Sequence, residues 1–258
     1  MLAYQTREAG YCLPTLAPIH VVLPERLTMD PLAGTNWSAP GTVRGFAQSA
    51  PNAVLMRFAE GEVRRCGHGH ALDLGCGAGR NAVPLAGAGW NVLGLDLSWP
   101  MLLAAADRGA AAGLSDRLAW ALSPMEQIPA RDRSFDLIVA HGIWNLATSS
   151  RIFRRGVEEA ARVARPGAGL FVFTFSRNTF PTDTAPVPGE PFVFTQFSGE
   201  PQCFLTEEQL IQEMARVGFV IDPAVPMTEY NRPSPAVARL GGPPVILEAA
   251  FRFRGRDG

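Results

Sequence analysis

The residues best suited to chemistry lie between positions 71 and 97. Gly75, Gly77 and Gly79 follow a short apolar segment, and Asp96 ends the next apolar segment. Glycines let a loop approach a ligand through its backbone, and a carboxylate at the end of the following strand can accept hydrogen bonds from two ribose hydroxyls. The pattern therefore predicts a β-α-β unit that binds a nucleoside.

The glycine spacing distinguishes two kinds of nucleoside site. Dinucleotide-binding proteins carry G-x-G-x-x-G, and Arg80 stands where the third glycine of that pattern would be. An acid, Asp73, also precedes the loop. These residues argue against a nicotinamide-linked oxidoreductase, which stays open as an alternative.

Asp73, the G-x-G-x-G loop and Asp96 together resemble motifs I and II of the class I S-adenosylmethionine-dependent methyltransferases. Gly-Arg-Asn at 79–81 is similar to the tellurite-resistance and thiopurine type of small-molecule methyltransferase. The segment 96–102 and a Pro-Gly turn at 166–167 also fit the family. The resemblance covers roughly residues 50–254.

This resemblance implies an α/β fold, a Rossmann-like doubly wound sheet of seven strands in the order 3-2-1-4-5-7-6 with the last strand antiparallel. Apolar runs and turn residues place the expected strands at 70–74, 91–95, 118–122, 135–140, 170–175, 219–222 and 245–254. Helical spacing places helices at 53–65, 80–88, 101–108, 152–163 and 207–217. Ser98 is the expected N-cap of the third of these helices, and Thr206 with Gln209 is a capping-box match before the fifth.

The expected organisation is one methyltransferase domain over residues 50–258, preceded by an N-terminal extension or lid over 1–49. Prolines make residues 1–50 irregular, and Met29 is an alternative start. A Pro- and Thr-rich stretch, 177–204, reads as an insert in the domain, with a strand or hairpin arm at 192–197. Within the extension, three residues are lid candidates, with core packing as the alternative: Trp37, Arg44 and Phe46.

The resemblance names S-adenosylmethionine as the cofactor and S-adenosylhomocysteine as its product. It assigns cofactor binding to Asp73, Gly75, Cys76, Gly77, Asp96, Leu97, Met125, Glu126 and Ala140.

Asp73 would fix the loop or meet the cofactor's ammonium group. Arg80 would contact its carboxylate, unless it is a solvated helix residue. The aspartate that commonly binds adenine in the family is replaced by Pro124, so Ser123, Glu126 or the Met125 backbone N–H would have to hold the base.

His141 is the catalytic candidate, because it follows the expected strand 135–140. A neutral imidazole there can take a proton from a phenol, alcohol or amine. The alternative is a positioning residue or a pocket wall. Two further sets could line the acceptor pocket or pair with an acidic acceptor, or be ordinary packing and surface residues: Trp144, Phe180, Phe194, Phe197 and Tyr230, and the arginines Arg177 and Arg232.

The amino-acid composition limits the partners and the kinds of chemistry that are expected. The net charge is -1, so neither nucleic acid nor a membrane surface is an expected partner. All 23 basic residues are arginine, which excludes chemistry that needs a lysine side chain. The four cysteines form no C-x-x-C pair and suit a reducing cytoplasm. No metal is expected, although Cys66, His68 and His70 lie close in sequence.

The sequence therefore predicts an enzyme that transfers a methyl group from S-adenosylmethionine to an O, N or S nucleophile of a small molecule, as a monomer or homodimer. Two alternatives stay open: a protein that binds the same cofactor but performs different chemistry, such as cyclisation, and a non-catalytic cofactor sensor.

Overall fold

A computed structural model of the protein describes residues 30–232 and 242–255. Its α-helices are α1 (Pro40–Gln48), α2 (Ala53–Cys66), α3 (Ala82–Gly87), α4 (Trp99–Ala111), α5 (Ser150–Val163) and α6 (Glu207–Ala215). Its strands are β1 (His70–Leu74), β2 (Asn91–Asp96), β3 (Leu118–Leu122), β4 (Phe135–His141), β5 (Ala164–Phe175), β6 (Val193–Phe194), β7 (Gln202–Cys203), β8 (Phe219–Ile221), β9 (Thr228–Tyr230) and β10 (Ile246–Phe253).

One mixed sheet organises these elements in the order β3-β2-β1-β4-β5-β10-β8, with β9 also paired to β10. The strands β3, β2, β1, β4 and β5 are mutually parallel, and β10 is antiparallel to β5. The predicted doubly wound sheet and its strand order are confirmed. The strand β9 was not predicted; it lies beside β8 on the same edge of β10.

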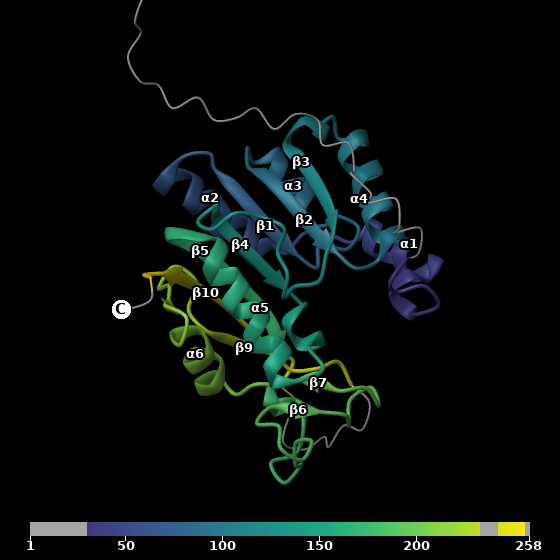
Figure 1. The fold of residues 1–258 in the computed structure, drawn as a ribbon, viewed down its shortest axis with the longest axis vertical. Coiled ribbons are helices and arrows are strands. Elements are labelled where there is room, and N and C mark those ends of the chain that lie inside the picture. Colours follow the sequence, from purple (N-terminus) through teal and green to yellow (C-terminus); the bar gives the residue numbers. More distant parts are fainter. Residues whose placement is uncertain (1–29, 233–241, 256–258) are drawn as a thin grey trace, which may run out of the picture.

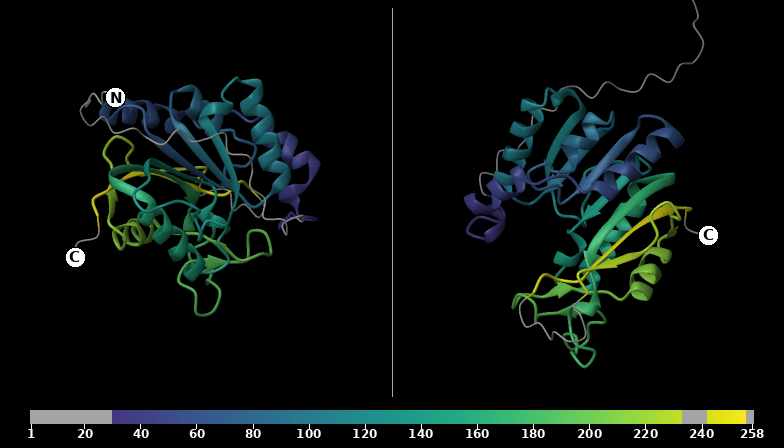
Figure 2. Two further views of the ribbon diagram at one scale, coloured as in Figure 1. Left: turned by 45° about the horizontal axis from the view of Figure 1, so that its top comes forward. Right: turned by 180° about the vertical axis from the view of Figure 1, so that it is seen from behind.

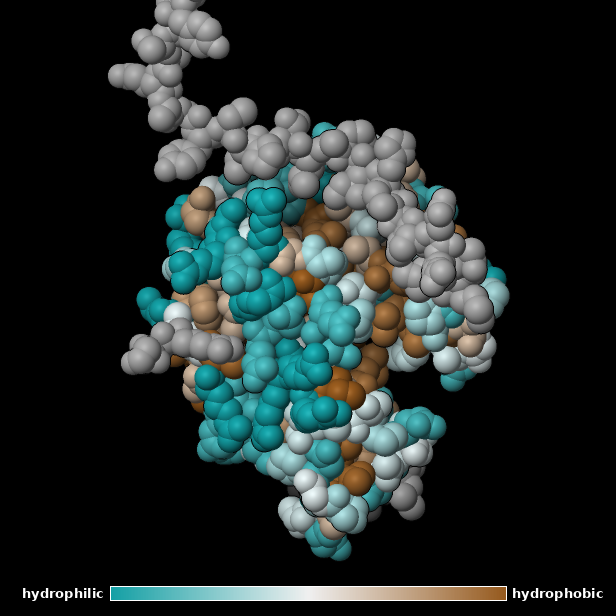
Figure 3. Space-filling view, in the orientation of Figure 1, coloured by the Kyte–Doolittle hydropathy of each residue, from teal (hydrophilic) through white to brown (hydrophobic). Residues whose placement is uncertain are grey.

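Helices cover both faces of this sheet, as the two further views show (Figures 1 and 2). Alternate residues of the strands point to opposite faces. Leu72 and Ile138 therefore join the core beneath α5 and α6, whereas Ala71 and Val139 join the core beneath α2 and α3. Hydrophilic residues cover the outer surface of α5 in the space-filling view (Figure 3).

Side-chain caps begin four of the helices. Asn52, Ser98 and Ser149 each accept a hydrogen bond from the first turn of the following helix. Thr206 and Gln209 form the predicted capping box of α6. Such caps satisfy backbone N–H groups that have no partner within the helix.

Two local predictions were wrong. Residues 1–50 were expected to be irregular, yet α1 begins at Pro40, because proline at the first helical position loses no hydrogen bond. The turn expected at 165–169 is the first part of β5, where a register shift against β4 accommodates Gly167 at φ +80°. The suggested start at Met29 lies outside the described residues.

The segment 177–204 contains the strand β6 within the predicted strand or hairpin arm at 192–197, and β6 pairs antiparallel with β7, which was not predicted. Phe192, Val193 and Cys203 are almost fully buried and belong to the core beneath α5. The insert is thus anchored in the main core.

Candidate active site

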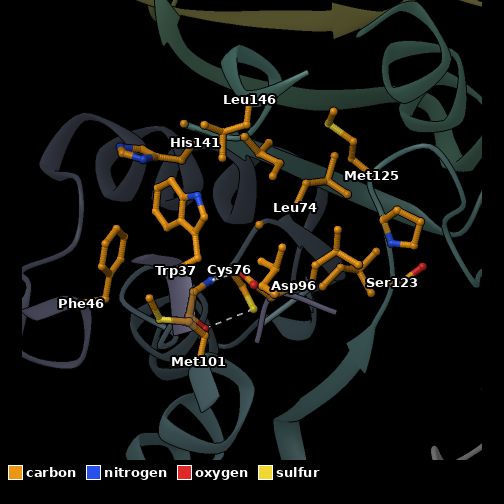
Figure 4. Close-up of a pocket in the computed structure, with 18 of the residues that line it drawn as sticks. Trp37, Phe46, Leu74, Cys76, Asp96, Met101, Ser123, Met125, His141 and Leu146 are labelled. Carbon is orange, nitrogen blue, oxygen red and sulfur yellow. Dashed lines mark hydrogen bonds between the residues drawn. The ribbon is translucent and has the colours of Figure 1, made fainter. Parts of the chain in front are cut away.

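The carboxyl ends of β1, β2 and β4 meet at a cavity of about 590 Å³. Its wall includes the glycine loop after β1, Asp96 at the end of β2 and His141 at the end of β4 (Figure 4). Open α/β sheets bind ligands at this edge, because the ends of parallel strands converge there. The topology thus brings together the main residues that the sequence predicts.

The glycine loop forms one wall with its backbone. Gly75 and Gly77 have φ values of +64° and +52°, which L side chains rarely adopt. A Cβ at position 75 would lie 2.7 Å from Ile143 Cδ1, and one at position 77 would lie 3.3 Å from Phe46 Cδ1. Ile143 and Phe46 therefore pack directly against the loop, which larger residues at positions 75 and 77 would hinder.

Asp96 presents its carboxylate to the cavity. Its Oδ2 accepts a hydrogen bond from Gly77 N (2.8 Å), and its Oδ1 accepts one from Ser98 N (2.8 Å). Burial raises the pKa of Asp96, and the hydrogen bonds from Ser98 and Gly77 oppose that shift. Each oxygen keeps further acceptor capacity, as two ribose hydroxyls require.

Asp73 and Ala140, both predicted to bind cofactor, are buried and do not line the cavity. Burial raises the pKa of Asp73 to about 7, and the charge of Arg80 opposes the shift. Its Oδ2 has no hydrogen-bond partner among the described residues. This position favours a role in fixing the loop.

The remaining predicted cofactor residues all line the cavity: Cys76, Leu97, Met125 and Glu126. At the expected adenine end, the Ser123 hydroxyl donates to the Gln127 carbonyl (2.5 Å). Of the groups expected to hold adenine, the Ser123 hydroxyl is therefore already engaged. The Glu126 side chain forms no hydrogen bond or ion pair among the described residues.

His141 stacks on Phe173, with ring centroids 4.2 Å apart and planes within 9°. Its Nε2 lies 3.1 Å from Arg80 Nη2 and 3.3 Å from Asn52 Nδ2. Burial, with the Arg80 charge, lowers the pKa of His141 to about 4, so the imidazole is neutral at pH 7.

The N-terminal segment 30–48 packs against α4 at the cavity mouth. Asp30 Oδ1 accepts a hydrogen bond from Trp99 N (3.1 Å), and the hydroxyls of Ser38 and Ser98 are 2.9 Å apart. Trp37 and Phe46 line the cavity, but Arg44 does not.

Sequence reasoning missed several lining residues outside the motifs: Leu32, Ile143, Leu146, Thr148, Ile152 and Phe173. Asn81 and Met101 also line the cavity; they lie within the segments 79–81 and 96–102, but their place in the wall was not predicted. Their placement depends on which elements meet at the cavity, and only the order of the sheet could have suggested it. The aromatic candidates Trp144, Phe180, Phe194, Phe197 and Tyr230 lie elsewhere. Arg177 donates to loop carbonyls, and Arg232 pairs with Glu229.

Within the described parts of the chain, no group of three or more His, Cys, Asp or Glu side chains is arranged to hold a metal ion. Among the same residues, no helix has both the length and the apolar character needed to cross a bilayer.

Known proteins share this architecture. Residues 71–167 match the family model described as "Methyltransferase domain". The ubiquinone/menaquinone biosynthesis C-methyltransferase UbiE of Geotalea daltonii is 31% identical over 128 residues, covering 48% of this chain and 53% of that protein. The chain thus spans about half the length of this curated relative.

Two solved structures show the same fold at low identity. The [4+2]-cyclase SpnF superposes with a TM-score of 0.59 at 20% identity, over 80% of this chain and 84% of that one. The Burkholderia thailandensis 1,6-didemethyltoxoflavin-N1-methyltransferase, bound to S-adenosylhomocysteine, gives 0.55 at 19% identity, over 78% of each chain.

The family match identifies a methyltransferase domain within residues 71–167 of this chain. The finer resemblance to the tellurite-resistance and thiopurine type is not tested by these matches and stays a prediction.

Proposed function

We propose that this protein transfers a methyl group from S-adenosylmethionine to an uncharged, largely apolar small molecule. The single observation that supports this most strongly is the composition of the cavity. One side combines the glycine loop with Asp96, and the other side is almost entirely apolar.

The residues present fit the cofactor. Gly75 and Gly77 line the cavity with their backbone alone, which suits close approach of its amino acid and ribose parts. The Asp96 carboxylate is suited to the ribose diol, and Leu97, Met125 and Glu126 to the adenine end. Arg80, beside His141 at the cavity wall, is suited to the cofactor's carboxylate.

When bound, S-adenosylmethionine supplies an electrophilic methyl group on a positively charged sulfur. The protein's task is mainly to align a nucleophile with that methyl group and to exclude water. The apolar wall and the packed N-terminal segment 30–48 serve both purposes, and we assign residues 30–48 to the surroundings of the acceptor. No residue of the segment 177–204, all of which the structure describes, lines the cavity.

The acceptor class follows from what remains of the lining. After the cofactor residues are set aside, the wall is mainly apolar, and its polar members are Thr148, Asn81, Ser123 and His141. The last three have partners within the protein: Asn81 accepts from Asn52 N, Ser123 donates to the Gln127 carbonyl, and His141 faces Arg80 and Asn52. The apolar members include Leu32, Trp37, Phe46, Ile143, Leu146, Ile152 and Phe173. A charged acceptor would lose its hydration there without gaining a partner.

A screen with radiolabelled S-adenosylmethionine tests the proposal. The panel contains neutral aromatic alcohols, thiols and amines, each with a carboxylated analogue, and a short RNA. We expect label transfer to a neutral member and at least ten times less to its charged analogue. Cofactor binding without transfer to any member would favour the cofactor sensor, and consumption of cofactor without a methylated product would favour different chemistry.

A further inference from the structure

A chain of polar contacts leads from the cavity to a buried carboxylate on β10. Glu248 is only 2% exposed. Its Oε2 accepts a hydrogen bond from Asn52 Nδ2 (2.7 Å), and its Oε1 accepts one from the Tyr230 hydroxyl. The same Nδ2 of Asn52 lies 3.3 Å from His141 Nε2. Residues from β10, the start of α2 and the end of β4 are thereby linked.

The orientation of the Asn52 amide is fixed by its role as a helix cap. Its Oδ1 accepts hydrogen bonds from Val54 N and Leu55 N, both at 2.9 Å. The oxygen therefore faces α2, and the NH₂ group must face Glu248 and His141. One amide hydrogen is available for each of these two acceptors.

These neighbours also define the tautomer of His141. Arg80 Nη2 and Asn52 Nδ2 are donors only. Arg80 Nη2 lies 3.1 Å from Nε2 and 3.4 Å from Nδ1, whereas Asn52 Nδ2 approaches Nε2 alone, at 3.3 Å. The Asn52 contact therefore favours a lone pair on Nε2, which places the proton of the neutral ring on Nδ1. Stacking on Phe173 holds the plane of the ring.

We infer that Asn52 and Glu248 are positioning residues, which hold the His141 imidazole with an unprotonated Nε2 beside Arg80 at the cavity wall. This inference rests on the proposed function, because the His141 imidazole and the Arg80 guanidinium would lie at the expected amino acid end of the cofactor.

This series of hydrogen bonds orients the His141 ring but does not transfer a proton, because the Asn52 amide does not titrate near neutral pH. Glu248 has no ion-pair partner among the described residues, so its charge strengthens the hydrogen bond from Asn52. Arg57 lies near enough for its charge to act on Glu248, and it lowers the pKa that burial has raised.

The substitution Asn52→Ser provides the test, because serine keeps a capping oxygen for α2 but removes the NH₂ group. Glu248→Gln is the second variant. It removes the charge and replaces one accepting oxygen with an NH₂ group, for which the Tyr230 hydroxyl can act as acceptor. Glu213→Gln is the matched control, since Glu213 is also buried (6% exposed) but pairs with Arg154, away from the cavity.

The primary measurement is the ring tautomer of His141 by ¹H–¹⁵N NMR, with its signals assigned from their loss in His141→Gln. We expect a single Nδ1–H tautomer in the unsubstituted protein and in Glu213→Gln, and a mixture of tautomers in Asn52→Ser. In Glu248→Gln, the ¹⁵N chemical shift of His141 Nε2 should move in the same direction as in Asn52→Ser. If Asn52→Ser does not fold, Glu248→Gln decides the matter. A tautomer unchanged in the folded variants would overturn the inference.

Kinetics provide a second measurement. Because misplacement by about 1 Å can cost 10²-fold in rate, we expect kcat/KM for S-adenosylmethionine to fall about 10- to 100-fold in Asn52→Ser. The NMR experiment needs neither cofactor nor acceptor. Absence of methyl transfer would thus reject the proposed function alone, and an unchanged tautomer would reject this inference even in an active enzyme.

Discussion

The chemistry of His141 depends on which of its atoms is free. A general base needs an available lone pair and a pKa near the working pH. In the structure, Nε2 faces the donors Arg80 and Asn52, and burial lowers the pKa of the ring to about 4. This arrangement favours orientation of the cofactor end, and the base role stays a prediction that requires Arg80 to move.

Substitution of Gly75 tests whether the backbone of the glycine loop forms one wall of the cavity. Gly75→Ala places a Cβ within 3.0 Å of three Ile143 atoms at a φ of +64°. We expect a loss of roughly 1–3 kcal/mol in the free energy of unfolding, measured by urea denaturation, together with weaker cofactor binding.

Gly61→Ala in α2 is the control for that substitution. A Cβ there would meet only Arg64 Nη2 at 3.9 Å, and its φ is not positive. Alanine should stabilise this helix by about 0.5–1 kcal/mol. Equal effects of the two substitutions would contradict the packing of the loop.

Asp73 should make stability depend on pH. Its pKa is about 7 in the folded protein, raised from the ordinary value of 3.8, because burial disfavours the charged form. The protonated side chain therefore stabilises the fold below pH 4, and this contribution is lost as pH rises towards 7. The largest slope for one such group is about 1.4 kcal/mol per pH unit.

The substitution Asp73→Asn removes this titration. Subtracting its unfolding free energies from those of the unsubstituted protein, measured between pH 4 and 8, cancels the other groups that titrate. We expect the difference to fall with pH up to about 7 and then level off. A difference that is flat over this range would show that Asp73 is ionised throughout.

At the level of secondary structure, the sequence predicted those helices and strands that are determined mainly by their own residues. The apolar segment at 70–74 and the caps Ser98 and Thr206 each have their own signal, and all three are confirmed. The strand β9 was missed because its Thr228–Tyr230 segment is short and is defined by pairing with β10. The helix α1 was missed because the prolines, which preclude a long helix before Gly41, led to the prediction that all of residues 1–50 are irregular, whereas Pro40 fits the first position of a helix.

Substitution of Trp37 tests whether the N-terminal segment 30–48 forms part of the acceptor wall. It is 39% exposed and packs edge-on against Phe46, with ring centroids 6.0 Å apart. Removing its indole by Trp37→Ala should raise KM for the acceptor about tenfold, equivalent to about 1.4 kcal/mol. The unfolding free energy should change little, because the side chain is partly exposed.

Leu103→Ala in α4 is the matched control, since Leu103 is 49% exposed and does not line the cavity. Its steady-state kinetics should equal those of the unsubstituted protein. If Trp37→Ala also leaves KM unchanged, residues 30–48 are not part of the acceptor wall.

At the level of the whole molecule, the sheet explains why the site was only partly predictable. Gly75, Gly77 and Asp96 lie within one contiguous motif, so sequence spacing was sufficient for them. Glu248 and Asn52 are 196 residues apart, and they meet only because β10 inserts beside β5. No local pattern marks such a contact.

The central claim is that the cavity binds S-adenosylmethionine with Asp96 at its ribose. Isothermal titration of the cofactor into the unsubstituted protein and into Asp96→Ala tests it most directly, with circular dichroism to check folding. We predict one site per chain and a loss of about 1–3 kcal/mol in binding free energy in Asp96→Ala, because hydrogen-bonding partners are left unpaired. The absence of binding by the unsubstituted protein, or equal affinity in both proteins, would contradict the account.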